Sequence, residues 1–185
     1  MFLSSEKNNT NERGSAELDA LLCGISKGDQ KDFEQFYLRT RSSVYSFALS
    51  ILKNPFDAED VLHDCYVLVW NNAPWYRSQG KPLAWLMTIT RNLSLQHLRE
   101  RQRRSDAPEE EWLRDLSDER GLSLEDRTIL SSCLEALSPQ EQQIVTLHAV
   151  AGFKHREIAE LLELPLATVL SKYSRAMKRL KKQLQ

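Results

Sequence analysis

The sequence is poor in residues that interrupt helices and in residues that build disulfide or metal sites. It has six glycines and six prolines among 185 residues, and its three cysteines (Cys23, Cys65 and Cys133) lie far apart without a C-x-x-C pair. This spacing argues against a disulfide framework or a cysteine-rich zinc site and suits a reducing compartment. The four histidines form no ligand cluster. We therefore expect no metal and no other cofactor.

Long hydrophobic runs are also missing. Residues 1–15 contain too few apolar side chains for a signal peptide, and no stretch approaches the length of a membrane span. These absences predict a cytoplasmic protein with no direct membrane insertion. No nucleophile–base pair stands out either, so we expect neither an enzyme nor a small-molecule substrate.

The formal net charge of −1 hides a strong segregation of charge. Residues 106–126 hold nine acids and two bases, which gives −7, whereas residues 154–185 hold eight bases and three acids, which gives +5. Residues 91–104 hold five arginines and one glutamate, which gives +4. Two basic segments suggest a polyanionic partner that is contacted at two places. In isolation, solvated surfaces explain the same runs equally well.

Apolar residues recur at intervals of three and four, and no alternating strand pattern occurs. The predicted fold is all-α, with two small helical domains joined by an acidic linker. We place a disordered N-terminus at 1–15, the first domain at 16–104, the linker at 105–124 and the second domain at 125–185. Ser138 followed by Pro139 predicts a capped helix start in the second domain.

The segment 155–182 predicts two helices separated by a three-residue turn, which is the spacing of a helix-turn-helix. On the last helix, Val169, Tyr173, Ala176 and Leu180 share the predicted buried face. Hydroxyl and basic side chains occupy the opposite face, where they suit base edges and phosphates in a major groove. A basic amphipathic surface helix is the structural alternative. The turn carries Glu163 where glycine is common.

Two features of the first domain also indicate binding. The segment 57–72 predicts a helix with one apolar face and an opposite face that carries acids, His63 and Val67. This second face suits either docking on a basic helix or simple solvation. Trp75, Tyr76 and Arg77 follow in a loop broken by glycine and proline, ahead of a helix that holds Arg91. Aromatic and arginine side chains in such a loop can hold unstacked bases.

Three of these segments together resemble the extracytoplasmic-function sigma factors, the two-domain group IV sigma factors of bacteria. "DAEDVLHDCYVLVW" is similar to their region 2.2, "PLAWLMTITRNLSLQHLR" to regions 2.3–2.4, and residues 137–180 to region 4. The resemblance covers about residues 19–184. Glu163 and Leu170 depart from the frequent glycine and basic residue of the family.

The resemblance implies an alternative sigma factor that binds RNA polymerase core, through the β′ clamp helices and the β flap, and opens promoter DNA. It also implies an anti-sigma factor as a further partner, and a linker that threads the polymerase channels. The implied core-binding residues are Asp57, Glu59, Asp60, His63, Asp64, Val67 and Asn71. The implied −10 residues are Trp75, Tyr76, Arg77, Ser78, Gln79, Lys81, Arg91 and Asn92. The implied −35 residues are Thr168, Leu170, Ser171, Lys172, Ser174, Arg175, Lys178 and Arg179.

Two other classes of protein remain open from the residues alone. A stand-alone helix-turn-helix regulator would bind duplex DNA without polymerase, but it leaves the 57–72 stripe and the Trp75 loop unexplained. An adaptor with a degenerate DNA-binding domain would be favoured by Glu163 and Leu170.

Overall fold

The structure, a computed structural model, describes residues 3–104 and 137–183, and the chain is helical without strands in both ranges. The first group of helices comprises α1 (Leu3–Ile25), α2 (Gln30–Leu52), α3 (Pro55–Asn72), the 3-10 helix η1 (Ala73–Trp75) and α4 (Pro82–Arg104). The second group comprises α6 (Pro139–Ala149), α7 (His155–Leu162) and α8 (Leu166–Gln183). The predicted all-α class is confirmed. The linker predicted at 105–124 lies outside the described residues.

The N-terminal helix is longer than expected. We predicted disorder through residue 15, but α1 begins at Leu3. A helix that is already held by packing gains one backbone hydrogen bond for each residue it adds, so a polar composition does not prevent its extension. Burial of Leu22 and Ile25 supplies that packing, because both are almost inaccessible to solvent.

Local sequence signals explain where the next helices begin. The Asp29 side chain accepts hydrogen bonds from the backbone amides of Lys31 and Asp32 and so caps α2. Asn54 caps α3 in the same way, with Pro55 in the first turn. Asp57 is the acid in the first turn of this helix.

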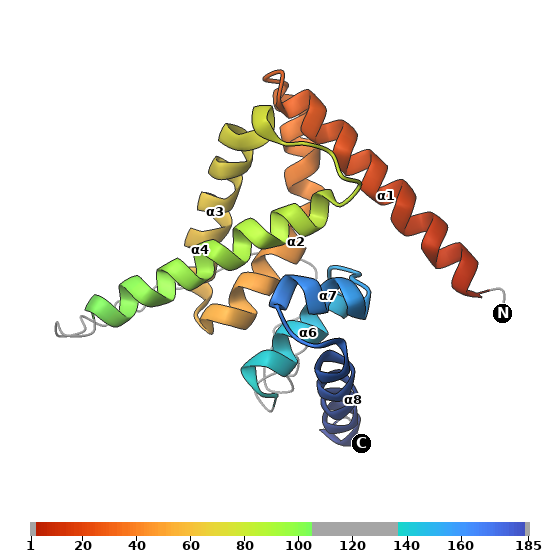
Figure 1. Ribbon diagram of the computed structural model, residues 1–185. Helices are drawn as coiled ribbons and strands as arrows, with labels where there is room; N and C mark the ends of the chain where they lie inside the picture. Colours follow the sequence, from red (N-terminus) through yellow and green to blue (C-terminus); the bar gives the residue numbers. More distant parts are fainter. Residues whose placement is uncertain (1–2, 105–136, 184–185) are drawn as a thin grey trace.

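The first group packs α1, α2, α3 and α4 around a shared apolar core (Figure 1). Its centre contains Phe36, Val44, Phe47, Leu86 and Met87, all fully buried. Burial of each such side chain contributes roughly 1.5–3 kcal/mol before conformational entropy is counted. The core therefore fixes the relative positions of α3, α4 and the loop between them.

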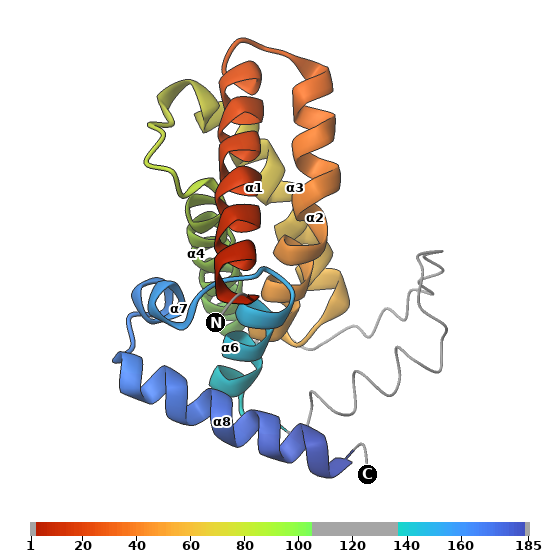
Figure 2. The same ribbon diagram turned by 90° about the vertical axis from the view of Figure 1, so that its right-hand side faces the viewer.

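The second group lies against one end of the first, and α8 runs across that end of the molecule (Figure 2). α6 packs on α2 and α7 packs on α4. Phe153, in the loop between α6 and α7, is buried in the same core cluster as Phe36. Lys53 at the end of α2 also donates a hydrogen bond to the Gln142 side chain of α6. The two groups thus form one packed unit.

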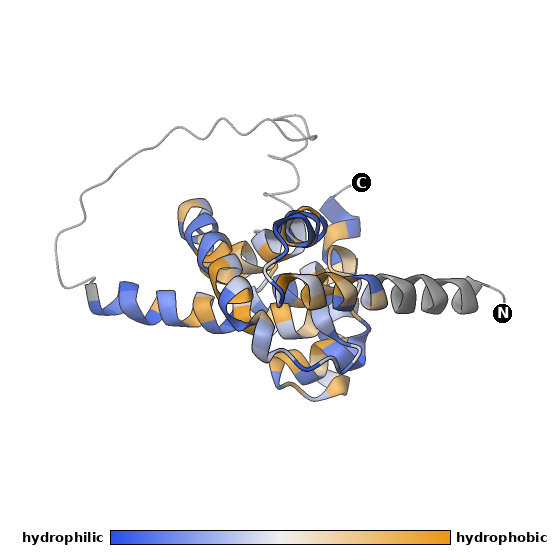
Figure 3. Ribbon diagram, turned by 90° about the horizontal axis from the view of Figure 1, so that it is seen from above, coloured by the Kyte–Doolittle hydropathy of each residue, from blue (hydrophilic) through white to orange (hydrophobic). Residues whose placement is uncertain are grey.

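The C-terminal half of α4 projects away from this unit (Figure 3). Arg99, Arg101 and Arg103 are exposed on it, and the ribbon there is hydrophilic. A basic, weakly packed helix end is available to a polyanion.

Candidate nucleic-acid interface

α7 and α8 form the helix-turn-helix that the spacing predicted. The turn contains Glu163, whose backbone is left-handed (φ 56°) although it is not glycine. This conformation costs a non-glycine residue roughly 1–2 kcal/mol. The amide of Leu164 donates to the Ala159 carbonyl at 2.9 Å, which satisfies the end of α7. The turn therefore closes without glycine.

The faces of α8 agree with the helical-wheel prediction. Val169 and Ala176 are fully buried, and Tyr173 and Leu180 are partly buried. The predicted DNA-facing side chains Leu170, Ser171, Ser174, Arg175, Lys178 and Arg179 are exposed, whereas Thr168 and Lys172 lie at the edge. The Arg175 Nε donates to the Ser171 carbonyl at 3.3 Å, which holds its stem along the helix and leaves the guanidinium end free to bind. The arrangement suits readout of a groove.

Arg179 already has a partner within the protein. Its Nη1 lies 2.9 Å from Glu141 Oε2, and the Glu141 side chain is only 4% exposed. Glu141 also completes the capping box with Ser138 at the start of α6. Burial by itself raises the pKa of the Glu141 carboxyl, but the hydrogen bonds from Ser138 and the charge of Arg179 outweigh it, so this pKa lies below its usual value. Arg179 thus ties α8 to α6.

Two histidines that the sequence analysis did not single out pack against α8. The rings of His148 and His155 stack with centroids 4.5 Å apart, and both meet Tyr173 of α8 edge-on. His148 Nδ1 lies 2.8 Å from the Phe153 carbonyl, which positions the α6–α7 loop. Burial and the neighbouring His148 lower the pKa of His155. The spacing of these residues in the sequence gave no signal for this cluster.

The loop between η1 and α4 exposes most of the predicted residues but ties two of them to α1 by their hydroxyls. Trp75 is 76% exposed, and Arg77, Gln79 and Lys81 are exposed as well. The Tyr76 hydroxyl instead donates to Asp19 Oδ1 at 2.6 Å, and the Ser78 hydroxyl donates to Asp19 Oδ2 at 2.8 Å. Both hydroxyls thus have partners within the protein, and direct contact of Tyr76 and Ser78 with DNA stays a prediction.

Two cationic side chains from the predicted −10 set meet acids of α7 and its turn. Arg91 Nη1 lies 3.1 Å from Glu163 Oε1, and Lys81 Nζ lies 3.5 Å from Glu160 Oε2. Asn92, beside Arg91, is exposed. The packed arrangement of the two groups thus places carboxylates against two side chains that we predicted to contact −10 DNA.

The outer face of α3 presents most of its predicted stripe. Asp60, His63, Asp64 and Asn71 are exposed, and Val67 is 46% exposed. Glu59 is partly buried at its edge. Asp57 is the exception, because its side chain is 17% exposed and its Oδ2 lies 3.3 Å from Arg101 Nη1 and 3.9 Å from His97 Nδ1 of α4. Asp57 therefore joins α3 to α4.

An aromatic hollow of about 490 Å³ adjoins this stripe, lined in part by His63, Val67, Phe33, Tyr37 and Trp70. The rings of Phe33 and Trp70 meet edge-to-face at 5.2 Å, and Trp70 is 36% exposed. Sequence periodicity on α3 alone does not show that the α2 side chains Phe33 and Tyr37 share this surface. An acidic rim around an apolar hollow is suited to a helix with basic and aliphatic side chains.

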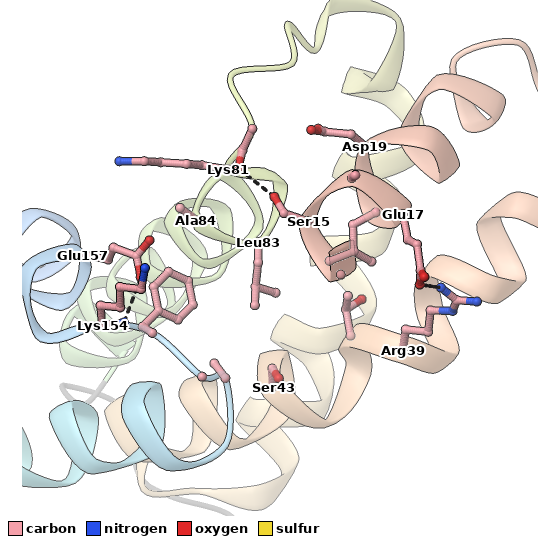
Figure 4. A pocket seen from close by; sticks show the side chains of 18 residues that line it. Ser15, Glu17, Asp19, Arg39, Ser43, Lys81, Leu83, Ala84, Lys154 and Glu157 are labelled. Carbon is pink, nitrogen blue, oxygen red and sulfur yellow. Dashed lines mark hydrogen bonds and ion pairs between the residues drawn. The ribbon is translucent and has the colours of Figure 1, made fainter. Parts of the chain in front are cut away.

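A second hollow of about 530 Å³ lies where α1, α2 and α4 meet the α6–α7 loop (Figure 4). Charged side chains such as Glu17, Arg39, Lys81 and Glu157 surround it. Within the described parts of the chain, no group of three or more His, Cys, Asp or Glu side chains could hold a metal ion. None of the described helices is long and apolar enough to cross a membrane.

A two-part helical protein with an exposed basic helix-turn-helix, an aromatic loop and an acidic docking face has the features of a DNA-binding transcription factor. Comparison with protein families agrees: a model for sigma-70 region 2 matches residues 36–104, and a model for sigma-70 region 4 matches residues 127–180. Together they match more than half of the chain.

Curated relatives extend the match across both parts. The ECF RNA polymerase sigma factor SigK of Mycolicibacterium vanbaalenii is 29% identical over 180 residues, covering 91% of this chain and 89% of the relative. SigK of Mycobacterium tuberculosis is 28% identical over 176 residues, covering 91% and 94%.

Solved structures share the fold. The sigma factor RpoE of Bartonella quintana, crystallised with the anti-sigma factor NepR, is 26% identical with a TM-score of 0.63, covering 83% of this chain and 97% of that one. CnrH, solved with the cytosolic domain of CnrY, is 22% identical with a TM-score of 0.61, covering 91% and 97%. This chain belongs to the extracytoplasmic-function sigma factors of the sigma-70 family. It directs promoter recognition and transcription initiation as an alternative sigma factor.

Proposed function

We propose that residues 16–104 bind core polymerase and the −10 element, and that residues 125–185 bind the −35 element. The observation that carries this assignment is the exposure, on one chain, of a basic α8 face, the Trp75 loop and the acidic face of α3. Each surface is held by a buried core on its other side. Initiation then requires no catalytic group of the chain's own, and its targets place the protein in the cytoplasm.

The acidic face of α3 is the proposed contact with the β′ clamp helices. Asp60, Asp64 and His63 offer polar contacts around Val67. The aromatic hollow beside them, lined in part by Trp70, offers an apolar surface. A few desolvated aromatic or aliphatic anchors carry most of the free energy of such interfaces, and the charges around them set orientation and association rate.

The Trp75 loop and the adjoining α4 are the proposed −10 reader. An exposed indole can stack on an extruded base, which contributes about 1–3 kcal/mol per base. Arg77, Gln79 and Asn92 supply hydrogen-bond donors around it, and Arg91 and Lys81 supply positive charge. A base held outside the duplex favours the melted promoter over the closed one.

α8 is the proposed −35 reader, with Ser171, Ser174 and Arg175 at base edges. Lys172 and Lys178 flank them and can neutralise phosphates. Leu170 is 47% exposed on this helix, so it can meet a thymine methyl group in the major groove. The β flap is the proposed polymerase contact of this domain.

The proposed −10-binding and −35-binding surfaces must move apart to contact one promoter at the same time. Elements centred about 25 base pairs apart lie about 85 Å apart along B-DNA. A single folded unit of this length has a radius of gyration of only about 16 Å. The segment between Arg104 and Leu137 can reach about 110 Å when extended, so it is long enough for both contacts. Breaking the Arg91–Glu163 and Lys81–Glu160 ion pairs is part of this separation.

A protein partner that restrains the chain fits the same surfaces. RpoE was solved with the anti-sigma factor NepR, and CnrH was solved with the cytosolic domain of CnrY. We propose that an anti-sigma factor covers the α3 face or the DNA-binding faces of this chain.

Electrophoretic mobility shift on a cognate promoter, with and without core polymerase, tests the assignment. We expect sequence-selective binding only with core. Trp75→Ala should then reduce transcription from duplex promoter much more than from a pre-melted template, because the lost base contact acts on opening. Tight, selective duplex binding without core would instead support a stand-alone regulator.

A further inference from the structure

The loop between η1 and α4 is tied to α1 at alternate residues. Tyr76 and Ser78 donate their hydroxyl hydrogens to the two oxygens of Asp19, and the Ser15 hydroxyl donates to the Gly80 carbonyl at 2.7 Å. Ser15 and Asp19 are one helical turn apart, so they lie on the same face of α1. Figure 4 shows both side chains on the side of α1 that faces the segment leading into α4.

This alternation sets the direction in which successive loop side chains point. The backbone of Tyr76 is extended (φ −61°, ψ 132°), and successive side chains of an extended chain point to opposite sides. Tyr76 is half-buried and Ser78 is exposed, but Asp19 holds both of their hydroxyls on the α1 side. Arg77 and Gln79, which are also exposed, then point to the other side of the loop. A slip by one residue would exchange the two sets.

Further contacts make Tyr76 a firm attachment point. Its ring packs on Trp85 of α4 with centroids 4.9 Å apart, and its amide donates to the Asn72 carbonyl at 3.1 Å. Burial raises the pKa of the Tyr76 hydroxyl, and the hydrogen bond to Asp19 and its charge raise it further. Tyr76 therefore stays a donor to Asp19 at physiological pH.

We infer that Asp19 is a positioning residue for −10 recognition. Its hydrogen bonds fix the register of the loop so that Trp75, Arg77 and Gln79 face the extruded base. The inference rests on the proposed role of the loop. Asp19 contacts no DNA in this account. Its effect passes through Tyr76 and Ser78, two predicted −10 residues whose hydroxyls bond to Asp19.

The test is in vitro transcription with core polymerase on a library of −10 variants, read as the preference for each base. A hydrogen bond to a charged acceptor typically contributes enough to change an equilibrium about tenfold. Asp19→Ala should therefore reduce the preference between best and worst −10 bases by about three- to tenfold, with core binding unchanged. Asp19→Asn, which keeps one acceptor oxygen, should restore part of the preference.

Matched variants separate positioning from simple destabilisation. Tyr76→Phe combined with Ser78→Ala removes the same two hydrogen bonds from the loop side while keeping the ring on Trp85. Adding Asp19→Ala to this pair should have little further effect, as expected for residues that act as a unit. Glu17→Ala, on the same helix with an exposed partner in Arg39, should leave base preference unchanged.

The outcomes distinguish this inference from the proposed function. If Arg77→Ala alters base preference but Asp19→Ala and the Tyr76/Ser78 pair do not, the loop reads DNA and Asp19 does not position it. If none of these variants alters base preference, the loop is not the −10 reader and the inference fails with that proposal. A flattened preference in both Asp19→Ala and the Tyr76/Ser78 pair, with wild-type melting temperatures, supports the inference.

Discussion

Arg91 and Glu163 lie 72 residues apart in the sequence, yet their side chains meet at 3.1 Å across the junction between α4 and the turn of the helix-turn-helix. Glu163 also has the left-handed backbone conformation that glycine adopts at a lower free-energy cost than any other residue. One residue therefore closes the turn and pairs with a predicted DNA contact. The pair belongs to the packed arrangement of the two groups. If Arg91 contacts the promoter as proposed, it must be released from this pair.

Glu163→Gly should weaken the packed arrangement without weakening the turn. Glycine relieves a cost of roughly 1 kcal/mol at this backbone conformation, while loss of the Arg91–Glu163 ion pair, in which Glu163 is exposed and Arg91 partly buried, removes about 1 kcal/mol. We expect the average distance between probes on α4 and α8 to increase in fluorescence energy transfer, with region 4 melting at the same temperature or higher.

Glu163→Gln is the matched control, because it removes the charge and keeps a side chain at the turn. It should increase the probe distance as glycine does. An unchanged distance in both variants would show that the ion pair does not hold the two groups together.

The elements with local signals were predictable from the sequence. Ser138 caps the start of α6 as its position before Pro139 indicated, with Glu141 completing a capping box. The buried faces of α3 and α8 follow the three-and-four periodicity. The Glu163 turn also falls where the break between α7 and α8 was placed.

Contacts between distant segments were not predictable in the same way. The helical periodicity places Asp57 on the exposed face of α3, but in the structure it forms an ion pair with Arg101 of α4. Tyr76 is an aromatic loop residue of the kind that stacks on bases, but its hydroxyl donates a hydrogen bond to Asp19 of α1. Periodicity assigns a side chain to a face of its own helix, and only tertiary packing shows what lies opposite that face.

Arg175→Ala should reduce discrimination at the −35 element by about 1–3 kcal/mol, since a guanidinium that contacts a base edge contributes that much. The measurement is competition between consensus and single-base-substituted −35 promoters in the presence of core. Lys181→Ala, at the far end of α8, is the control and should weaken all promoters alike or none. Equal loss across all −35 variants in Arg175→Ala would reassign Arg175 to a phosphate contact.

Reversal of charge at Asp60 and Asp64 should abolish binding to core while leaving the fold intact, because both side chains are exposed on α3. Like charges placed against a basic partner surface cost several kcal/mol. Co-purification with core gives the binding readout, and circular dichroism gives the fold. Asp60→Asn with Asp64→Asn should have a smaller effect, and Glu17→Lys on α1 should have none. Retained core binding by the double-lysine variant would exclude this face of α3.

The stacked pair His148 and His155 should make region 4 sensitive to mild acid. The pKa of His155 is lowered in the folded protein from its ordinary value of 6.5 by burial and by His148. The unfolded chain therefore takes up a proton first as the pH falls below about 6.5, so stability decreases from there until the folded pKa is passed. Glu141 acts in the opposite sense and at lower pH, because its lowered pKa contributes stability that is lost only as the pH falls below about 4.5.

Thermal melting of the full chain between pH 7.5 and 5.5 separates the two groups. We expect the melting temperature of the wild type to fall across this range and that of His155→Phe to fall less, because phenylalanine keeps the ring contact with Tyr173 and cannot be protonated. Glu141→Gln should leave the slope between pH 7.5 and 5.5 unchanged. An equally steep slope in His155→Phe would assign the acid sensitivity to a group other than the stacked pair.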